Sequence, residues 1–447
     1  MVMTTHKFEY VMSAAAHTRI TISSGIVGEA RDRIKKVIDT AESMFVNHQY
    51  TTLYNAFTES QLGNSMYTAG YLPHPMHSDS GGLQIITRGL TADNDIKRKV
   101  YKEQANYSGF AMCFDEIPVE TVGQSRIGNL SNRVFRPDWI DAKAKETCKN
   151  IVAQAALFQK LGSNTKIMLI VQGNCYETYM RWIDACVRYL PKEVYPFIGG
   201  MSFAGTSSGS GELEDIERIF SFGICEVPPE WKTGLHLLGV GSIRRLLPLV
   251  GFIHSGLINN IKISYDSTTH SAGMSYRRFN DINNKVIACG VEDRRGMQML
   301  YDYTKDYFNI ESDYDTFFDT IFYNRDGFVK KYGADKIHLF HETMIAACMV
   351  SILHTTNTLD ALAGDKNIYD LAAGKQCDPM RGLINIVDKE DYNRYIKEYG
   401  RYLDSSRIKK SGESVMLDLD VSLPTTFLPK PAKNKATEKS SVESFFV

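Results

Sequence analysis

Residues Lys166-Ile-Met-Leu-Ile-Val-Gln-Gly173 form a short apolar run that ends in an amide side chain and a glycine. A helical pattern follows over Glu177 to Tyr189, with apolar residues at helical spacing, and a second apolar run follows over Pro196 to Ser202. A buried strand, a helix and another buried strand in succession predict two parallel strands that lie side by side. This stretch therefore indicates an α/β protein built from strand–helix–strand units.

The same unit recurs over the first two thirds of the chain. Further apolar runs, each bounded by Gly, Pro or polar residues, predict strands at Glu9 to Ala15, His77 to Gly82, Phe110 to Glu116, Leu235 to Gly241 and Ile261 to Asp266. Further helical patterns lie at Trp139 to Leu161, Leu213 to Phe222 and Ser242 to His254. With an eighth strand expected between residues 40 and 72, the pattern predicts a (β/α)8 barrel, and an open doubly wound sheet is the alternative.

The positions of polar residues favour the barrel over the open sheet. Five residues are expected at or just beyond the carboxyl ends of predicted strands: Asp79, Asp115, Gln172, Gly200 and Asp266. In a barrel of this type the carboxyl ends of the strands form the rim that carries the catalytic residues. We therefore expect an active site at this rim.

The hydrophobic pattern divides the chain into three parts. The barrel is expected over residues 1–310, and a helical region packed on the barrel over residues 311–423. Two helices are predicted in that region, at Tyr314 to Tyr332 and at Asp335 to His354. Residues 424–447 hold three prolines and four lysines with little hydrophobic pattern, which is typical of a flexible tail.

Composition and charge exclude several classes of protein. The chain has 447 residues, of which 43% are hydrophobic, and a formal net charge of -1, so a polycationic arm is excluded. It has no run of about 18 apolar residues that would span a membrane, and a soluble cytoplasmic protein is expected. The 8 cysteines include no Cys-x-x-Cys or Cys-x-Cys pair, so the usual signature of a structural zinc site is missing.

Three of the predicted strand ends carry side chains suited to binding a flat polar ligand. Asp79 is followed by Ser80 and two glycines, which let a backbone approach a ligand closely, although an ordinary turn has the same sequence. Asp115 follows an apolar strand and, as an alternative, could cap a helix. Gln172 can present a donor and an acceptor together to the edge of a heterocycle.

Taken in order, these motifs resemble the tRNA-guanine transglycosylase superfamily. The resemblance extends from about Asp79 to Asp266, and its most specific parts are Asp-Ser-Gly-Gly-x-Gln at residues 79–84 and Gly-Val-Gly at residues 239–241. Members of this family are (β/α)8 barrels that exchange a guanine in a polynucleotide for a 7-deazaguanine. The resemblance thus implies both the fold and a base-exchange reaction.

The resemblance implies roles for particular residues. Asp266 is expected to be the nucleophile and Asp79 the general acid and base. The expected base-binding residues are Ser80, Asp115, Gln172, Gly199, Gly200, Met201 and Leu238. Base exchange with retention at C1′ needs two displacements through a covalent intermediate, and one group with a pKa near neutral can serve both proton transfers.

Guanine itself suggests how these residues would divide the work of recognition. It presents N1–H and N2–H donors beside the O6 acceptor. Asp115 can accept from the donors, while Gln172 and the backbone of Gly200 and Met201 can donate to O6.

The chain departs from the family pattern in ways that bear on its substrate. Leu83 stands where the family usually has an aromatic residue, and residues 200–211 are longer and richer in Gly and Ser than the family's turn. Residues 267–270 lack the family's Pro-Thr-Arg, and no Cys-x-Cys-x-x-Cys precedes His338 or His341. Because both of these missing features belong to tRNA recognition in the family, the sequence favours the DpdA-like DNA-guanine transglycosylases.

The sequence therefore predicts an enzyme that replaces guanine in DNA by a 7-deazaguanine of the preQ0 or preQ1 kind. Its alternatives are action on tRNA, or a non-catalytic nucleic-acid-binding partner subunit. Arg277 and Arg278 are the first candidates for phosphate contacts. No cofactor is expected, and packing or surface roles are preferred to zinc binding for the histidines. A homodimer through the C-terminal helices is expected by analogy with the family, in the cytoplasm or, for a phage-encoded protein, in the host cytoplasm.

Overall fold

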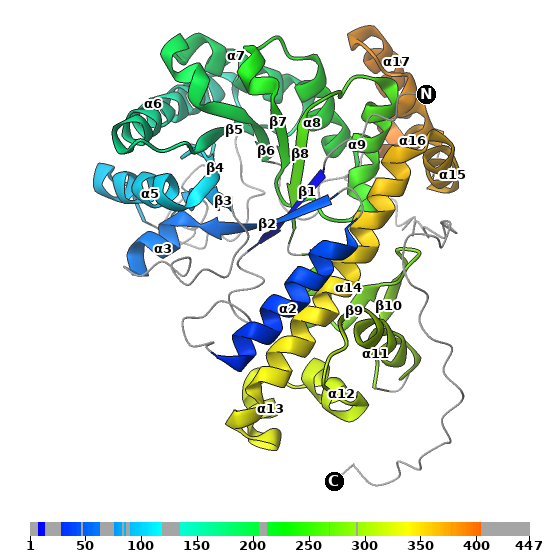
Figure 1. The fold of residues 1–447 in the computed structure, drawn as a ribbon. Helices are drawn as coiled ribbons and strands as arrows, with labels where there is room; N and C mark the ends of the chain where they lie inside the picture. The colour runs from blue at the N-terminus through cyan, green and yellow to red at the C-terminus, as the bar shows by residue number, and fades with distance from the viewer. Residues whose placement is uncertain are drawn as a thin grey trace.

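Eight parallel strands close into a barrel in the order β1 to β8, so the predicted (β/α)8 barrel is confirmed (Figure 1). The strands are β1 (Phe8–Ser13), β2 (His48–Asn55), β3 (Met76–Asp79), β4 (Ser108–Met112), β5 (Lys166–Gln172), β6 (Ile198–Ala204), β7 (Gly234–Leu237) and β8 (Lys262–Asp266). The expected eighth strand is β2. The computed structural model describes residues 8–13, 28–45, 48–62, 76–82, 85, 90–118, 135–204, 212–267, 269–291, 294–376 and 378–403.

Helices surround the barrel and follow its strands in turn. The first seven are α2 (Glu29–Met44), α3 (Ala56–Leu62), α5 (Asn94–Tyr107), α6 (Pro137–Leu161), α7 (Tyr176–Tyr189), α8 (Glu212–Ile224) and α9 (Ile243–Ser255). Helix α6 has Pro137 in its first turn, and Gly162, which caps its carboxyl end, is in the left-handed conformation. Both are the residues that favour those helix ends. The four helices predicted between residues 139 and 254 agree with the structure to within two residues at each end.

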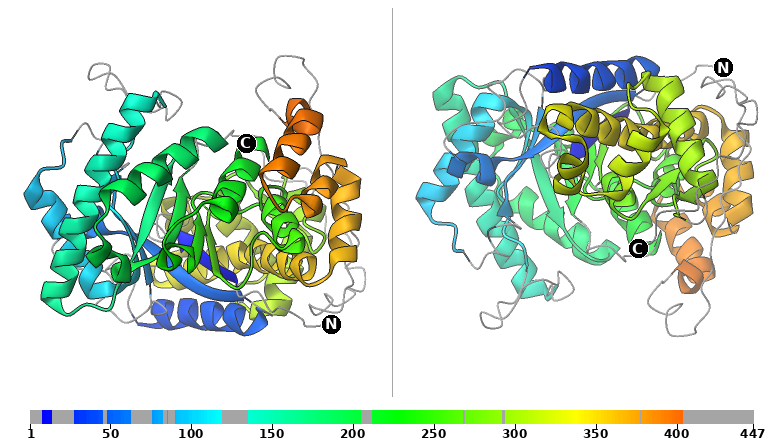
Figure 2. Two further views of the ribbon diagram at one scale, coloured as in Figure 1. Left: turned by 90° about the horizontal axis from the view of Figure 1, so that it is seen from above. Right: turned by 90° about the horizontal axis from the view of Figure 1, so that it is seen from below.

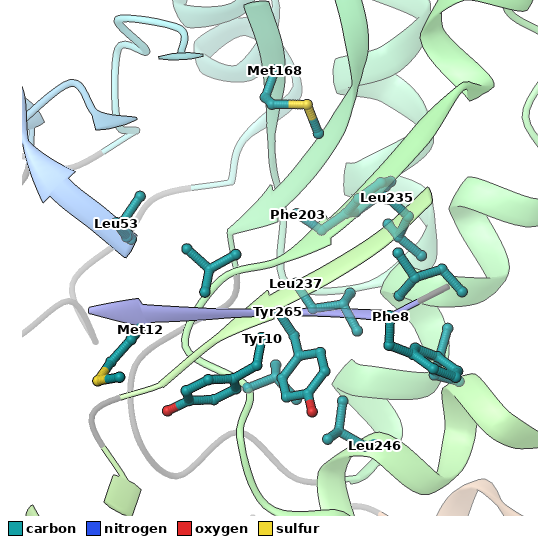
Figure 3. Close-up of a cluster of buried hydrophobic side chains, with 14 of the residues drawn as sticks. Phe8, Tyr10, Met12, Leu53, Met168, Phe203, Leu235, Leu237, Leu246 and Tyr265 are labelled. Carbon is teal, nitrogen blue, oxygen red and sulfur yellow. The ribbon is translucent and has the colours of Figure 1, made fainter. Parts of the chain in front are cut away.

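The barrel strands are buried on both faces, because helices cover them on the outside and side chains fill the barrel. Six consecutive residues of β5 are buried, as are all four of β7. Figure 3 shows part of this core, with Tyr10 and Tyr265 meeting across the β1–β8 junction and Leu246 reaching in from α9. The parallel pairing of β1 with β8 closes the barrel between its first and last strands.

The eighth helix of the ring is α14 (Ile337–Gly364), far along the chain from β8. It packs along α2 and against α9, and the two helices α2 and α14 lie side by side (Figures 1 and 2). By length and composition its segment, Ala334–Gly364, could cross a membrane, but 72% of its most apolar window is buried inside the protein. The helix is therefore a core element of the barrel.

Residues 267–336 form an insertion between β8 and α14. It contains α10 (Thr269–Ser275), β9 (Arg278–Asn280), β10 (Val286–Ala288), α11 (Arg294–Phe308), α12 (Tyr314–Phe322) and α13 (Arg325–Tyr332). The domain boundary predicted at residue 310 falls inside this insertion, because the barrel is completed only by α14. We therefore extend the barrel domain to residue 364.

Two predicted helices in this region differ from the structure. The single helix expected over Tyr314 to Tyr332 is divided, because Tyr323 is extended and the Asn324 side chain caps α13 by accepting a hydrogen bond from the Gly327 N–H at 2.8 Å. The helix expected over Asp335 to His354 begins with a short 3-10 turn and continues to Gly364.

Three helices after α14 pack on the outside of the barrel. They are α15 (Lys366–Gln376), α16 (Asp378–Gly382) and α17 (Lys389–Leu403), and they contact α8 and α9. Phe220 and Tyr392 stack at 4.0 Å between α8 and α17, and the Lys389 ammonium lies over the neighbouring Tyr176 ring. This is the part of the predicted helical region that packs on the barrel. The predicted tail over 424–447 lies outside the described residues.

Candidate active site

Asp79 is the last residue of β3 and is half-buried. Its Oδ2 accepts a hydrogen bond from Nδ2 of Asn55 at 3.1 Å, and Asn55 is the residue paired with it on β2. The orientation of the Asn55 amide is fixed because its Oδ1 accepts from the Thr58 N–H at 2.8 Å. One oxygen of Asp79 is thus held by a fixed donor, and backbone hydrogen bonds from Ser80 and Gly81 also reach its carboxyl group.

The environment of Asp79 raises the pKa of its carboxyl group from 3.8 to about 6. Burial is the largest cause, and the negative charge of Asp266 adds to it, while hydrogen bonds from the Gly81 backbone and from Asn55 oppose the rise. The contribution from Asp266 means that the two carboxylates are near enough to interact. A carboxyl group with this pKa can both give and take a proton near neutral pH.

Asp266 is the last residue of β8, and only 8% of it is exposed. Its Oδ1 accepts a hydrogen bond from the Gly239 N–H at 3.0 Å and lies 3.2 Å from Nε2 of His236. Gly239 is in the short loop that follows β7, so the Gly-Val-Gly motif contacts the predicted nucleophile directly. Neither Asn55 nor His236 was expected at the site from sequence.

Asp115, which follows β4, meets Gln172, the last residue of the neighbouring strand β5. Nε2 of Gln172 donates to Oδ2 of Asp115 at 2.5 Å, and both side chains are buried. Oε1 of Gln172 is buried and accepts no hydrogen bond from the described residues. A buried acceptor without a partner is costly, so this oxygen is suited to a donor on a ligand.

The Asp-Ser-Gly-Gly motif lies against this pair. A Cβ atom on Gly82 would lie 3.6 Å from Oδ1 and from the backbone oxygen of Asp115, and 3.7 Å from Oγ of Ser80. Glu116, by contrast, points to the outer helices, where Lys97 Nζ lies 3.0 Å from its Oε1. Of the two consecutive acids, only Asp115 therefore belongs to the site.

Gly81 is required by the backbone of this turn. Its φ is +83°, and a Cβ atom there would lie 2.3 Å from Cβ of Phe57. We expect Gly81→Ala to lower the free energy of unfolding by about 2–4 kcal/mol, from left-handed strain and overpacking together. Gly162→Ala is the matched control, because Gly162 also has a positive φ but has no atom within 4 Å of the added Cβ, and it should lose only about 1 kcal/mol. Denaturant unfolding measures both, and equal losses would contradict the steric argument.

The structure does not bring Gly199, Gly200 and Met201 to this end of the barrel. Strand β6 runs from Ile198 to Ala204, so these residues lie in its first half, whereas the sequence placed Gly200 at its end. A Cβ atom on Gly200 would lie 2.4 Å from the backbone oxygen of Gly234, the first residue of β7, and one on Gly199 would meet Lys166, the first residue of β5. The expected contact of their backbone with O6 is therefore corrected: these glycines allow close strand packing near the amino ends.

Gly199 borders a cavity of about 390 Å³ at that opposite end of the barrel. Gly199, Lys166, Lys262 and Phe110 are among the residues that line it. Met201 is fully buried in the core. Residues 205–211, which follow β6 in the chain, lie outside the described residues.

Of the remaining predicted residues, Ser80 also binds Asp79 through its backbone N–H. Ser80 is buried and accepts from the Gly82 N–H at 3.4 Å, while Leu238 is half-buried at the end of β7. Arg277 and Arg278 are exposed in the insertion, with the Arg277 guanidinium 4.1 Å from the centre of the Phe322 ring. Leu83 lies outside the described residues.

The histidines considered for zinc lie on or beside α14. His338 is half-buried, with Nδ1 2.9 Å from the Asp335 backbone oxygen, and His341 is buried. Among the residues that the structure describes, no group of three or more His, Cys, Asp or Glu side chains is placed to hold a metal ion.

The fold and the site together define a (β/α)8-barrel protein with three carboxylates, Asp79, Asp115 and Asp266, at one end of the barrel. Compared with known proteins, the chain matches no family model and no curated protein sequence.

Proposed function

We propose that this protein is a base-exchange glycosyltransferase that replaces guanine in DNA by a 7-deazaguanine, through a covalent intermediate between Asp266 and the sugar. The single observation that carries the proposal is the pairing of two unlike carboxyl groups. Asp266 accepts a hydrogen bond from a backbone N–H through Oδ1. The pKa of Asp79 is raised to about 6 by burial and by the negative charge of Asp266. Two carboxyl groups in unlike environments are suited to separate roles as nucleophile and acid.

In the first displacement, an Asp266 oxygen attacks C1′ of the target nucleoside and forms a carbon–oxygen bond. The bond from C1′ to N9 of guanine breaks, and its electron pair leaves with the base. The proton on Asp79 passes to the departing guanine, which is a poor leaving group as an anion. Asp79 is then ionised, and the sugar is held by an ester bond to Asp266.

In the second displacement, the incoming 7-deazaguanine gives its N9 proton to the Asp79 carboxylate. N9 then forms a bond to C1′ as the bond to Asp266 breaks. Two inversions give net retention at C1′, and both carboxyl groups return to their initial states. No proton is gained or lost over the cycle, so one residue with a pKa near 6 suffices for both transfers.

Recognition of the base is assigned to Asp115 and Gln172. The Asp115 carboxylate can accept from N1–H and N2–H of guanine. Gln172 keeps one amide hydrogen for O6 and offers its unpartnered Oε1 to a further donor. A base bound to the buried Asp115 and Gln172 side chains would have to be turned out of the duplex.

Gly82 leaves the space beside Asp115 that a flat base would need. We expect Gly82→Ala to raise the Kd for guanine about 10-fold, which corresponds to about 1.4 kcal/mol. The melting temperature should stay unchanged, because the added Cβ would make only ordinary van der Waals contacts. Titration calorimetry with guanine measures the effect. Gly364→Ala, whose Cβ would meet no atom within 4 Å, is the control, and equal affinities in the two variants would contradict a base site at Gly82.

The choice of DNA over tRNA rests on the sequence after the nucleophile, where residues 267–270 differ from the tRNA-acting pattern. The test is incorporation of labelled guanine into duplex DNA and, in parallel, into unmodified tRNA. Labelling of DNA alone supports the proposal, and labelling of tRNA alone selects the tRNA enzyme. Binding of DNA without labelling or any covalent adduct selects a non-catalytic subunit. Nucleoside mass spectrometry of cells that make 7-deazaguanines then identifies the inserted base.

A further inference from the structure

A buried histidine lies directly behind the predicted nucleophile. His236 is on β7 and is completely buried. Its Nε2 lies 3.2 Å from Oδ1 of Asp266, and its Nδ1 lies 2.8 Å from Oγ of Ser264. The β7–β8 register pairs His236 with Ser264, so the barrel itself fixes both contacts.

The two partners of His236 differ in what they can donate. An ionised carboxylate only accepts hydrogen bonds, so Nε2 must carry hydrogen to bind Asp266. A serine hydroxyl can donate to Nδ1 of a neutral imidazole. The arrangement therefore selects the tautomer with hydrogen on Nε2, because the hydrogen bond at one ring nitrogen sets the state of the other.

We propose that His236 is a positioning residue for Asp266, oriented in turn by Ser264. This inference rests on the proposed function. The His236 Nε2–H and the Gly239 N–H both bind Oδ1, which leaves Oδ2 as the oxygen that attacks C1′. Because Oδ1 is held by two hydrogen bonds, the carboxylate approaches C1′ in a single orientation. The orientation of a nucleophile is a large part of its reactivity.

A second set of contacts holds the Gly239 donor in place. Nη1 of Arg245 donates to the Gly239 backbone oxygen at 2.8 Å, and the same guanidinium binds both oxygens of Asp215 at 2.8 Å. The loop after β7 is thereby tied to α8 and α9. Of the two donors to Oδ1, His236 lies within β7 and Gly239 lies just after it.

Three other titratable groups near His236, namely His77, Glu9 and Lys262, bind one another. The His77 ring lies 5.7 Å from the His236 ring, and its Nε2 binds Oε2 of Glu9 at 2.9 Å. Lys262 lies 3.0 Å from the same Glu9 oxygen. Burial would raise the pKa of Glu9, but the His77 hydrogen bond and the Lys262 charge lower it to about 2. Glu9 is thus an ionised partner for His77 and Lys262, and Asp266 is the carboxylate that His236 serves.

The test compares the rate of covalent adduct formation in His236→Leu, His236→Gln and Ser264→Ala. We expect His236→Leu to slow adduct formation about 100-fold while the Kd for guanine stays within a factor of two. His236→Gln keeps an N–H near Oδ1 and should recover most of the rate. Ser264→Ala keeps the imidazole but removes the hydroxyl that selects the tautomer with hydrogen on Nε2. It should slow the reaction about 10-fold. His254→Gln, on the outer helix α9, is the control for loss of a histidine.

A spectroscopic measurement separates positioning from a merely structural role. Nitrogen-15 chemical shifts of histidine-labelled protein should show His236 with hydrogen on Nε2 in the wild type and a mixture of tautomers in Ser264→Ala. Hydrogen on Nδ1 in the wild type, or an unchanged rate in His236→Leu, would overturn the positioning role alone. A wild-type protein that forms no adduct would overturn the proposed function and this inference with it.

Discussion

An Asp266→Asn variant is expected to lose base exchange by on the order of 10⁴-fold or more and to form no covalent adduct with the sugar. The amide has no charged oxygen to attack C1′. Its Oδ1 can still accept from Gly239 and His236, so the site should keep its shape. The measurement is mass spectrometry of protein trapped with labelled DNA and excess base, together with the rate of guanine exchange.

The control for this variant is Asp281→Asn in the insertion. Asp281 and Asp266 are both 8% exposed, and Oδ1 of Asp281 accepts the N–H groups of Asn283 and Lys285. It therefore tests loss of a buried, hydrogen-bonded carboxylate away from the site, and should keep full exchange activity. Equal activity in the two variants would remove Asp266 from the reaction.

The second large effect is expected from Asp79→Asn, which removes the proton donor and acceptor. Loss of a general acid slows a reaction by about 10²–10⁴-fold, and here both displacements would be affected. In the wild type, adduct formation should fall as the pH rises through about 6, because only protonated Asp79 can release guanine. The slow residual reaction of Asp79→Asn should lack this dependence. A pH profile of single-turnover adduct formation measures both, and the same profile in the two proteins would assign the proton to another group.

Asp79→Asn should also make the protein more stable, in the opposite direction to its effect on activity. The folded pKa of Asp79 lies above its ordinary value of 3.8, so the unfolded chain ionises first as the pH rises. Below about pH 4, Asp79 is neutral in both states and does not lower the free energy of unfolding. As the pH rises through about 6, the free energy of unfolding falls, by at most roughly 3 kcal/mol. The variant does not titrate there, so its gain over the wild type should be small at pH 4 and largest above pH 6. Denaturant unfolding at the two pH values tests this.

The sequence predicted the strands and the carboxylates better than the partners of those carboxylates. Asp79 and Asp266 end buried apolar runs, and an apolar run that meets a charged residue has a clear boundary. The apolar run around Gly199 and Gly200 has no charged residue to mark where β6 ends. The strand starts at Ile198, two residues later than expected, because Pro196 belongs to a 3-10 helix. Asn55 and His236 were missed because each contact joins residues 24 or 30 positions apart on two neighbouring strands, and the pattern within one strand does not show which residues of the next strand it will meet.

The closing helix of the barrel was also beyond reach of the sequence pattern. α14 is buried around most of its circumference, so it shows no polar face to mark it as an outer helix of a barrel. Its place between α2 and α9 depends on contacts with helices that begin roughly 90 and 300 residues earlier in the chain. Periodicity describes a helix's own faces and carries no information about such distant neighbours.

The late position of α14 has a consequence for biosynthesis. A nascent chain that has left the ribosome only as far as β8 holds every strand of the sheet, but it lacks the helix that covers the seam between the last strand and the first. The faces of α2 and α9 that α14 covers stay exposed to water and to chaperones until residue 364 has been synthesised. A truncation before α14 should therefore yield an aggregating product even though all eight strands are present.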